Sequence, residues 1–160
     1  MKKTAPEPAE KLSLDESAKY LLDEARLILP GIQSMFGFQL IATFTEAFGK
    51  LGAGERVIHL AALSLMAIAI VIIMTPAAIH RERGSREVRE DFIDISSALI
   101  LASMLPLAVG LCLDFYVVVS VIIDSRWGAG LAAALFAVFV FFWLLLPRSR
   151  KLQGLARGSR

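Results

Sequence analysis

The sequence is poor in the residue types on which most enzymes and metal centres depend. Cys112 is the only cysteine and there are two histidines, so no intrachain disulfide, cysteine zinc site or CxxC redox pair can form. No nucleophile elbow, phosphate-binding loop, HExxH motif or glycine-rich dinucleotide loop is present. We therefore expect no enzymatic activity, no catalytic residue, no bound metal and no cofactor. Cys112 lies in an apolar run, as buried structural thiols do.

Charge is also scarce. Charged residues make up 20% of the chain, against about 25% in an ordinary soluble domain. Hydrophobic residues reach 56% and the mean hydropathy is +0.64. The formal net charge of +2 provides no basic excess, and we expect no nucleic-acid partner. The apolar residues gather in four long runs, which predicts an all-α polytopic membrane protein whose first partner is the lipid bilayer.

The runs divide the chain into tails, an interfacial helix and a spanning domain. Residues 1–12 contain prolines and charges and read as a disordered tail. Ser13 and Glu16 form a capping box that opens an amphipathic helix over 13–29, suited to the headgroup layer. Pro30 and Gly31 should bend the chain as it enters the bilayer. A four-helix transmembrane domain then covers 30–147, with spans at about 31–48, 57–79, 93–123 and 127–146, before a basic cytoplasmic tail at 148–160.

Lysine and arginine predict the orientation of the spans. The N-terminal segment, the loop between the second and third spans and the C-terminal tail together hold 14 of these residues, and the other two loops hold 3. The positive-inside rule then places both termini in the cytoplasm. No apolar segment followed by a small-residue cleavage site precedes the first span, so we expect the spans themselves to direct insertion.

Asp114 is the strongest candidate for a functional group inside the membrane. It has apolar neighbours on both sides, and ionisable groups at such depth are usually functional. At about 100° per residue it shares a helix face with Ser103, and Pro106 on the same face frees a backbone carbonyl. These groups could hold a cation or a proton-linked water. Alternatively, Asp114 is structural, with a hydrogen bond to a neighbouring helix or an ion pair with Arg56 or Arg126.

A second set of polar residues belongs to the first span. Gln39, Thr43 and Glu46 share one helix face, and Glu46 lies at a depth close to that of Asp114. Two acids at one level could share a proton or hold a cation; otherwise Glu46 lies in the wet interface. His59 opens the second span on the same side, where it is either a titrating group or an ordinary interfacial residue.

Two stretches resemble a known family. Before the first span, acidic residues and an arginine in 21–26 are followed by Pro-Gly-Ile-Gln at 30–33 and Phe-Gly-Phe at 36–38. The second span ends in a Pro-x-x-x-His-Arg motif within residues 75–81. They are similar to a family of small four-helix membrane proteins of unknown function, common in actinobacteria, some of which are labelled sodium:proton antiporters. The resemblance implies the four-helix fold and the bacterial cytoplasmic (inner) membrane, and it draws attention to Gln33, His80 and Arg81.

Two functions fit these residues. The first is an ion or proton channel or transporter that moves a small cation or proton past Asp114, Glu46, Gln39, Thr43, Ser103 and His59. Four short helices without an internal repeat can hardly enclose such a path alone, so we expect a homo-oligomer. The second is a non-transporting accessory or scaffold protein that binds a partner through its helices. A polar helix face that lines a water-filled cavity would favour the channel or transporter. The same face buried against other helices would favour the accessory or scaffold protein.

Overall fold

A computed structural model describes residues 13–83, 90–123 and 125–146, so the predicted tails at 1–12 and 148–160 lie outside the described residues. In this part of the chain every regular element is a helix, which confirms the all-α prediction. The elements are α1 (Leu14–Thr43), α2 (Glu46–Gly49), α3 (Ala53–Arg83), α4 (Glu90–Ile122), α5 (Ser125–Phe139) and a π-helical turn, η1 (Val140–Leu145), that continues α5.

Helix α1 begins at the predicted capping box. The Ser13 hydroxyl accepts a hydrogen bond from the backbone N–H of Glu16 at 3.3 Å, and the Glu16 carboxylate accepts one from the backbone N–H of Ser13 at 2.9 Å. The helix then continues through Pro30, where the sequence predicted a bend between an interfacial helix and a span. Pro30 is exposed, so its ring does not disturb the packed face, and one 30-residue helix covers both predicted segments.

The same helix ends at Thr43, before the predicted limit of 48. The Thr43 hydroxyl donates to the Leu40 carbonyl at 2.6 Å and the Thr45 hydroxyl to the Ala42 carbonyl at 2.8 Å, so side chains take up carbonyls of the last turn. Thr45 then caps the short helix α2 by accepting from the backbone N–H of Phe48 at 3.4 Å. The chain therefore turns before Glu46, so Glu46 does not share a helix face with Gln39 as the sequence predicted.

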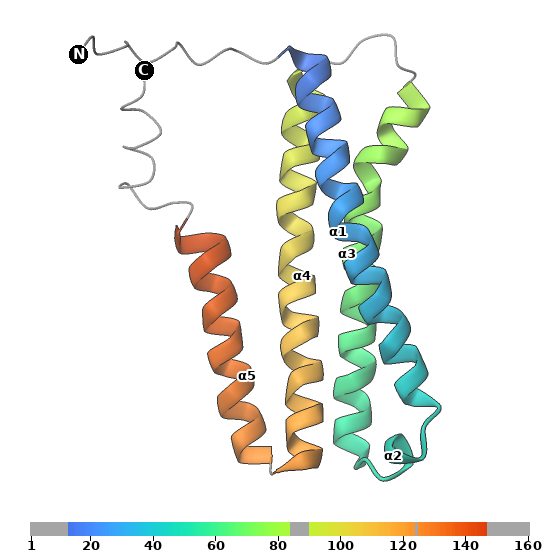
Figure 1. The fold of residues 1–160 in the computed structure, drawn as a ribbon, viewed down its shortest axis with the longest axis vertical. Helices are drawn as coiled ribbons and strands as arrows, with labels where there is room; N and C mark the ends of the chain where they lie inside the picture. The colour runs from blue at the N-terminus through green and yellow to red at the C-terminus, as the bar shows by residue number, and fades with distance from the viewer. Residues whose placement is uncertain (1–12, 84–89, 124, 147–160) are drawn as a thin grey trace, which may run out of the picture.

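Helices α1, α3 and α4 form an antiparallel bundle, and α5 lies beside α4 (Figure 1). Periodic buried residues explain the packing. In α1 they recur every seven positions, and in α3 they alternate at three and four, the spacing of helices that cross at a small angle. These residues are Ala18, Ala25, Ile32 and Gln39 in α1, and His59, Ala62, Met66, Ala69 and Ile73 in α3.

Glycines set the closest helix contacts. A Cβ built on Gly110 of α4 would lie 3.2 Å from the Ala62 carbonyl oxygen of α3, and one on Gly128 of α5 would lie 2.6 Å from the Ser120 hydroxyl of α4. Small residues allow this approach, as they do at many membrane helix interfaces. Gly128 thus serves packing between α4 and α5, whereas Gly130 has nothing within 4 Å.

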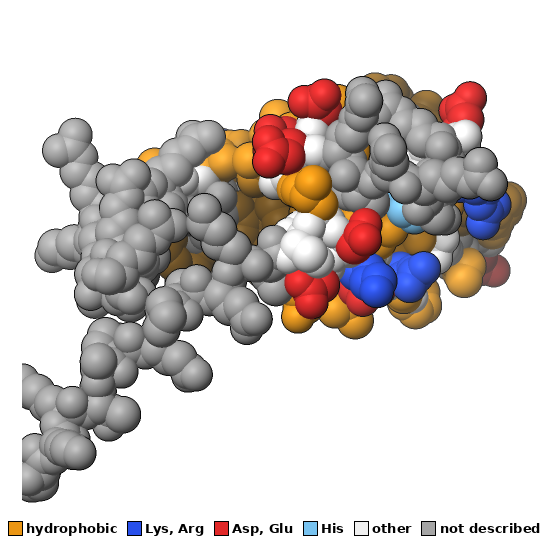
Figure 2. Space-filling view, turned by 90° about the horizontal axis from the view of Figure 1, so that it is seen from above, with side chains coloured by type: hydrophobic (Ala, Val, Ile, Leu, Met, Phe, Trp, Pro, Cys, Tyr) orange, Lys and Arg blue, Asp and Glu red, His pale blue; other side chains and the backbone are white. Residues whose placement is uncertain are grey.

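Three helices are long and apolar enough to cross a membrane: Ala53–Glu82, Glu90–Ile122 and Ser125–Leu145. By length and composition the described structure is thus that of a helical membrane protein. Helix α1 is not among the three, because its first half carries charged residues. On the end where α1 and α4 begin and α3 ends, acidic and basic side chains are visible beside apolar ones (Figure 2), as expected at a membrane–water boundary.

Candidate functional site

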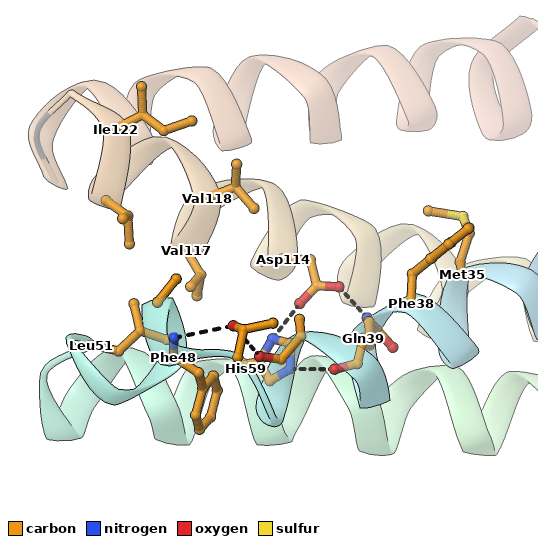
Figure 3. Close-up of a pocket in the computed structure, with 14 residues that line it drawn as sticks. Met35, Phe38, Gln39, Phe48, Leu51, His59, Asp114, Val117, Val118 and Ile122 are labelled. Atoms are coloured by element: carbon orange, nitrogen blue, oxygen red, sulfur yellow. Dashed lines mark hydrogen bonds and ion pairs between the residues drawn. The ribbon is translucent and has the colours of Figure 1, made fainter.

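One polar side chain from each of α1, α3 and α4 meets the others near the end of the bundle where α2 lies (Figure 3). Asp114 points from α4 toward Gln39 and His59. The Gln39 amide donates to one carboxylate oxygen of Asp114, and the other oxygen lies 3.0 Å from Nδ1 of His59. Nε2 of His59 lies 3.2 Å from the backbone carbonyl oxygen of Gln39. The three residues, called the triad below, close a ring of hydrogen bonds across three helices.

The triad is shielded from its surroundings. Gln39 and His59 are 6% and 7% exposed, and the Asp114 side chain is 21% exposed. The Phe48 ring of α2 stands edge-on to the His59 ring, with centroids 5.4 Å apart and an interplanar angle of 65°. Polar groups buried to this degree need hydrogen-bond partners, because their desolvation is costly. The ring of contacts supplies them to His59 and Asp114.

The hydrogen bonds of the triad depend on the number of protons that it holds. Each nitrogen of His59 faces an oxygen that accepts hydrogen bonds, but a neutral imidazole carries only one N–H. Both contacts can be hydrogen bonds at once only with a second proton, which would lie on the ring, as imidazolium beside a carboxylate, or on Asp114, which would then donate to Nδ1. In both forms His59 and Asp114 together hold one proton more than a neutral histidine and an ionised aspartate. Its removal leaves a lone pair facing an oxygen, which destabilises the contact.

A pocket of about 390 Å³ opens directly beside the triad, within the range of small-molecule sites. Its walls come from α1, the connection through α2, and the last turns of α4 (Figure 3). Gln39, Thr45, His59 and Asp114 are the polar side chains that line it; the remainder are aliphatic, aromatic or methionine, namely Met35, Phe38, Ala42, Ala47, Phe48, Leu51, Val117, Val118, Val121 and Ile122. The triad is therefore the polar part of an apolar pocket.

The other polar candidates lie apart from this ring. Thr43 is half-buried and bonded to its own helix, and Glu46 is exposed on α2. Ser103 is buried and donates to the Ile100 carbonyl at 2.6 Å; at about 1.5 Å per residue it lies roughly 16 Å from Asp114 along α4. Arg56, considered as a partner of Asp114, donates instead to the Gly49 carbonyl at 2.8 Å.

Of the residues singled out by the family resemblance, His80 and Arg81 lie toward the other end of the bundle. Gln33 is exposed on α1. The His80 ring lies against Phe92 with centroids 5.7 Å apart. With Arg26, His80 and Arg81 line a separate cavity of about 210 Å³ between α1 and α3. His80 is roughly 31 Å from His59 along α3 at about 1.5 Å per residue, so this cavity and the triad are independent.

Sequence reasoning named all three members of the triad but did not bring His59 and Asp114 together. It matched Asp114 with Glu46 by depth. A signal was present: His59 opens the series of buried α3 positions that continues through Ala62 and Met66, which places its ring on the face toward the other helices. In the described residues, no cluster of three or more His, Cys, Asp or Glu side chains could hold a metal ion.

Residues 7–147 match the model of a family of unknown function, DUF6328. The chain belongs to this family. The match to DUF6328 covers the triad and every described helix, and it confirms the resemblance to an uncharacterised family. No curated protein matches the chain. No solved structure matches it either.

Proposed function

We propose that the chain crosses a bacterial cytoplasmic membrane four times, with α1 as the first crossing and both termini in the cytoplasm. Residues 27–45 carry no charge, and their helical part, 27–43, is about 25 Å long, near the thickness of a hydrocarbon core. α1 also lies alongside α3 and α4 and runs antiparallel to α3 (Figure 1). A helix in that position shares the membrane depth of its neighbours. The 14-to-3 bias of lysine and arginine supports the orientation.

We infer further that the protein is a proton-linked transporter or channel and that the triad is its proton-binding site. The observation that carries this inference is the His59 ring held between two acceptor oxygens, at 3.0 and 3.2 Å. Both contacts can be hydrogen bonds only while His59 and Asp114 hold an additional proton. Because the contacts join α1, α3 and α4, loss of that proton weakens the cohesion of all three helices at once. Protonation is thereby coupled to helix packing, as proton-driven transport requires.

The surroundings favour a carrier over an open pore. On one side of the triad lies the pocket, and on the other the bundle is filled by apolar core residues, among them Met66, Ile73, Ile100 and Leu107. In this conformation the triad is therefore reached through the pocket and not through the core of the bundle. Alternating access would need movement against a second surface, and we propose that a second copy provides it. The outward side of α5 is extensively exposed.

The dry core also favours the alternative, a non-transporting accessory or scaffold protein. Ser96 is fully buried and its hydroxyl has no hydrogen-bond partner among the described residues, so the polar groups of α4 form no continuous chain between the two ends. In this reading the triad only fixes the packing of three helices. The two functions differ in one observable, the movement of protons across a membrane.

The test is proton flux into liposomes that hold the purified full-length protein and a trapped pH-sensitive dye. A pH gradient or a potassium diffusion potential drives the flux. We expect uptake above that of empty liposomes, and its loss in Asp114→Asn, which keeps the size of the side chain and removes the titrating group. Glu46→Gln is the matched control, because it removes a carboxylate at the same end that is exposed and outside the triad.

Asp114→Asn liposomes that take up protons like the parent would remove the triad from the pathway. Absence of flux in folded parent protein, under both gradients, would favour the accessory function.

A further inference from the structure

We propose that the pocket beside the triad binds a lipophilic organic cation, and that this cation takes the place of the proton held by His59 and Asp114. The inference rests on the proposed function, since it names the substrate class of the same site. It follows from three properties of the pocket: the chemistry of its wall, the charge of the triad with and without its proton, and the position of its mouth.

The wall suits an organic cation. Apolar side chains dominate it, and Phe38 and Phe48 contribute aromatic rings, which attract cations through their π-faces. His59 and Asp114 are the titratable side chains that line it, and no lysine or arginine does. An apolar surface with a single carboxylate binds the alkyl or aryl groups of a lipophilic cation by burial and its charge by attraction to the acid.

The charge balance makes the exchange one for one. With its proton, the triad is neutral overall, as imidazolium beside carboxylate or as neutral histidine beside carboxylic acid. Without it, the triad carries one negative charge in a site largely closed to water. An uncompensated charge there is costly. A monovalent cation restores neutrality as the proton did, so the two occupants compete: the cation enters, and one proton leaves to solvent.

Divalent metal ions fit the pocket poorly. Magnesium and calcium take six or more oxygen ligands, whereas the side-chain oxygens that line this pocket belong to Gln39, Thr45 and Asp114. Such an ion would lose its hydration without replacement. An anion would face the Asp114 carboxylate directly. A cation whose charge is spread over a large apolar molecule loses the least hydration on entry.

The mouth of the pocket provides the route. Phe38, Val118, Val121 and Ile122 are exposed apolar residues, at 70%, 53%, 54% and 72%, and all line the pocket. In a bilayer these side chains face lipid, so a lipophilic cation dissolved in the membrane meets the pocket from the side. Asp114 lies at its inner end, beside Gln39 and His59 (Figure 3).

Equilibrium dialysis of tetraphenylphosphonium against the purified full-length protein in detergent tests the proposal. We expect saturable binding that tightens by up to about tenfold per pH unit over the range in which the triad loses its proton. In weakly buffered solution, addition of the cation should release protons, up to one for each cation bound. Tetraphenylborate, which has the same shape and the opposite charge, should neither release protons nor compete.

Two variants locate the site. Asp114→Asn should abolish saturable binding, whereas Glu46→Gln should bind like the parent. Val118→Trp narrows the pocket from an exposed position and should weaken binding at least tenfold while Asp114 stays in place. This second variant keeps the test decisive if Asp114→Asn fails to fold.

Binding without proton release, or equal binding of tetraphenylborate, would overturn the proposal and leave an apolar groove for lipid chains. The proton-flux assay separates this inference from the proposed function. Proton flux without phosphonium binding would overturn the cation alone. Binding with proton release but without flux would keep the cation site and refute transport.

Discussion

His59 is the residue on which the candidate site depends most, because it is in contact with three elements. Its ring lies against the backbone of α1, the carboxylate of α4 and the Phe48 ring of α2. Asp114 has two partners, and one of them is His59. The energies of these two residues should therefore depend strongly on each other.

A double-mutant cycle measures that dependence. We expect His59→Ala and Asp114→Ala to show a coupling energy of about 1–3 kcal/mol, as for directly bonded groups in a network. Unfolding by increasing mole fraction of SDS, followed by the fluorescence of Trp127 and Trp143, provides the free energies. The cycle of Asp114→Ala with Ser103→Ala is the control, and it should be additive within about 0.5 kcal/mol because the two residues are not in contact. Additive energies for the His59 pair would mean that the contact contributes nothing.

A second residue-scale effect concerns the start of α1. Hydrogen bonds from the backbone N–H and the hydroxyl of Ser13 hold the pKa of Glu16 below its ordinary value. A carboxyl whose pKa is lowered by folding stabilises the folded form above its unfolded pKa, and this contribution is lost as the pH falls through the folded pKa. We therefore expect the first turn of α1 to fray in acid while remaining closed at neutral pH.

Amide hydrogen exchange of residues 14–18 would report the fraying. In Ser13→Ala the pH dependence should diminish but persist, because the cap and the hydroxyl hydrogen bond to Glu16 are gone while the backbone N–H of residue 13 remains. Unchanged exchange across this pH range in the parent would contradict the role of Glu16.

At the scale of helices, the close approach of α3 and α4 depends on Gly110. Its virtual Cβ lies 3.2 Å from the Ala62 carbonyl and 3.4 Å from Met66 Sδ, which is tight but leaves room for small shifts. We expect Gly110→Ala to be nearly neutral, since alanine gains up to about 1 kcal/mol of helix propensity. Gly110→Leu should destabilise by roughly 1–3 kcal/mol, as overpacked cores do.

Gly130 is the matched control, because it is also helical and has nothing within 4 Å. Gly130→Leu should leave the SDS unfolding midpoint near that of the parent. If the two leucine variants behave alike, the contact between α3 and α4 is looser than described.

The helices could largely be predicted from the sequence, and the site only in part. The Ser13–Glu16 capping box and the apolar runs are local signals, and they located the start of α1 and the apolar helices. The separate interfacial helix and span predicted around Pro30 form one continuous helix, because proline removes only one hydrogen bond of the helix and the rest of α1 continues past it. The pairing of His59 with Asp114 depends on the rotation of α3 against α4. That rotation is determined by the packing between helices, and it cannot be deduced from the spacing of residues within one helix.

For the whole molecule, the testable feature is which ends of the helices lie on the same side of the membrane. Ser13 lies at the end of the bundle where α3 ends and α4 begins, and Ser125 opens α5 at the opposite end (Figure 1). Both are exposed. In a Cys112→Ala parent, the single variants Ser13→Cys and Ser125→Cys are therefore reporters for the two sides.

We expect a membrane-impermeant maleimide to label Ser125→Cys in intact bacterial cells and Ser13→Cys only after the cells are opened, because the arginine-rich and lysine-rich segments lie in the cytoplasm. The reverse pattern would keep the four crossings and invert the protein. Labelling of both from one side would mean that α1 lies on the membrane rather than in it. The triad would then lie at the surface, since Gln39 belongs to α1, and a proton pathway at this site would be excluded together with the fourth crossing.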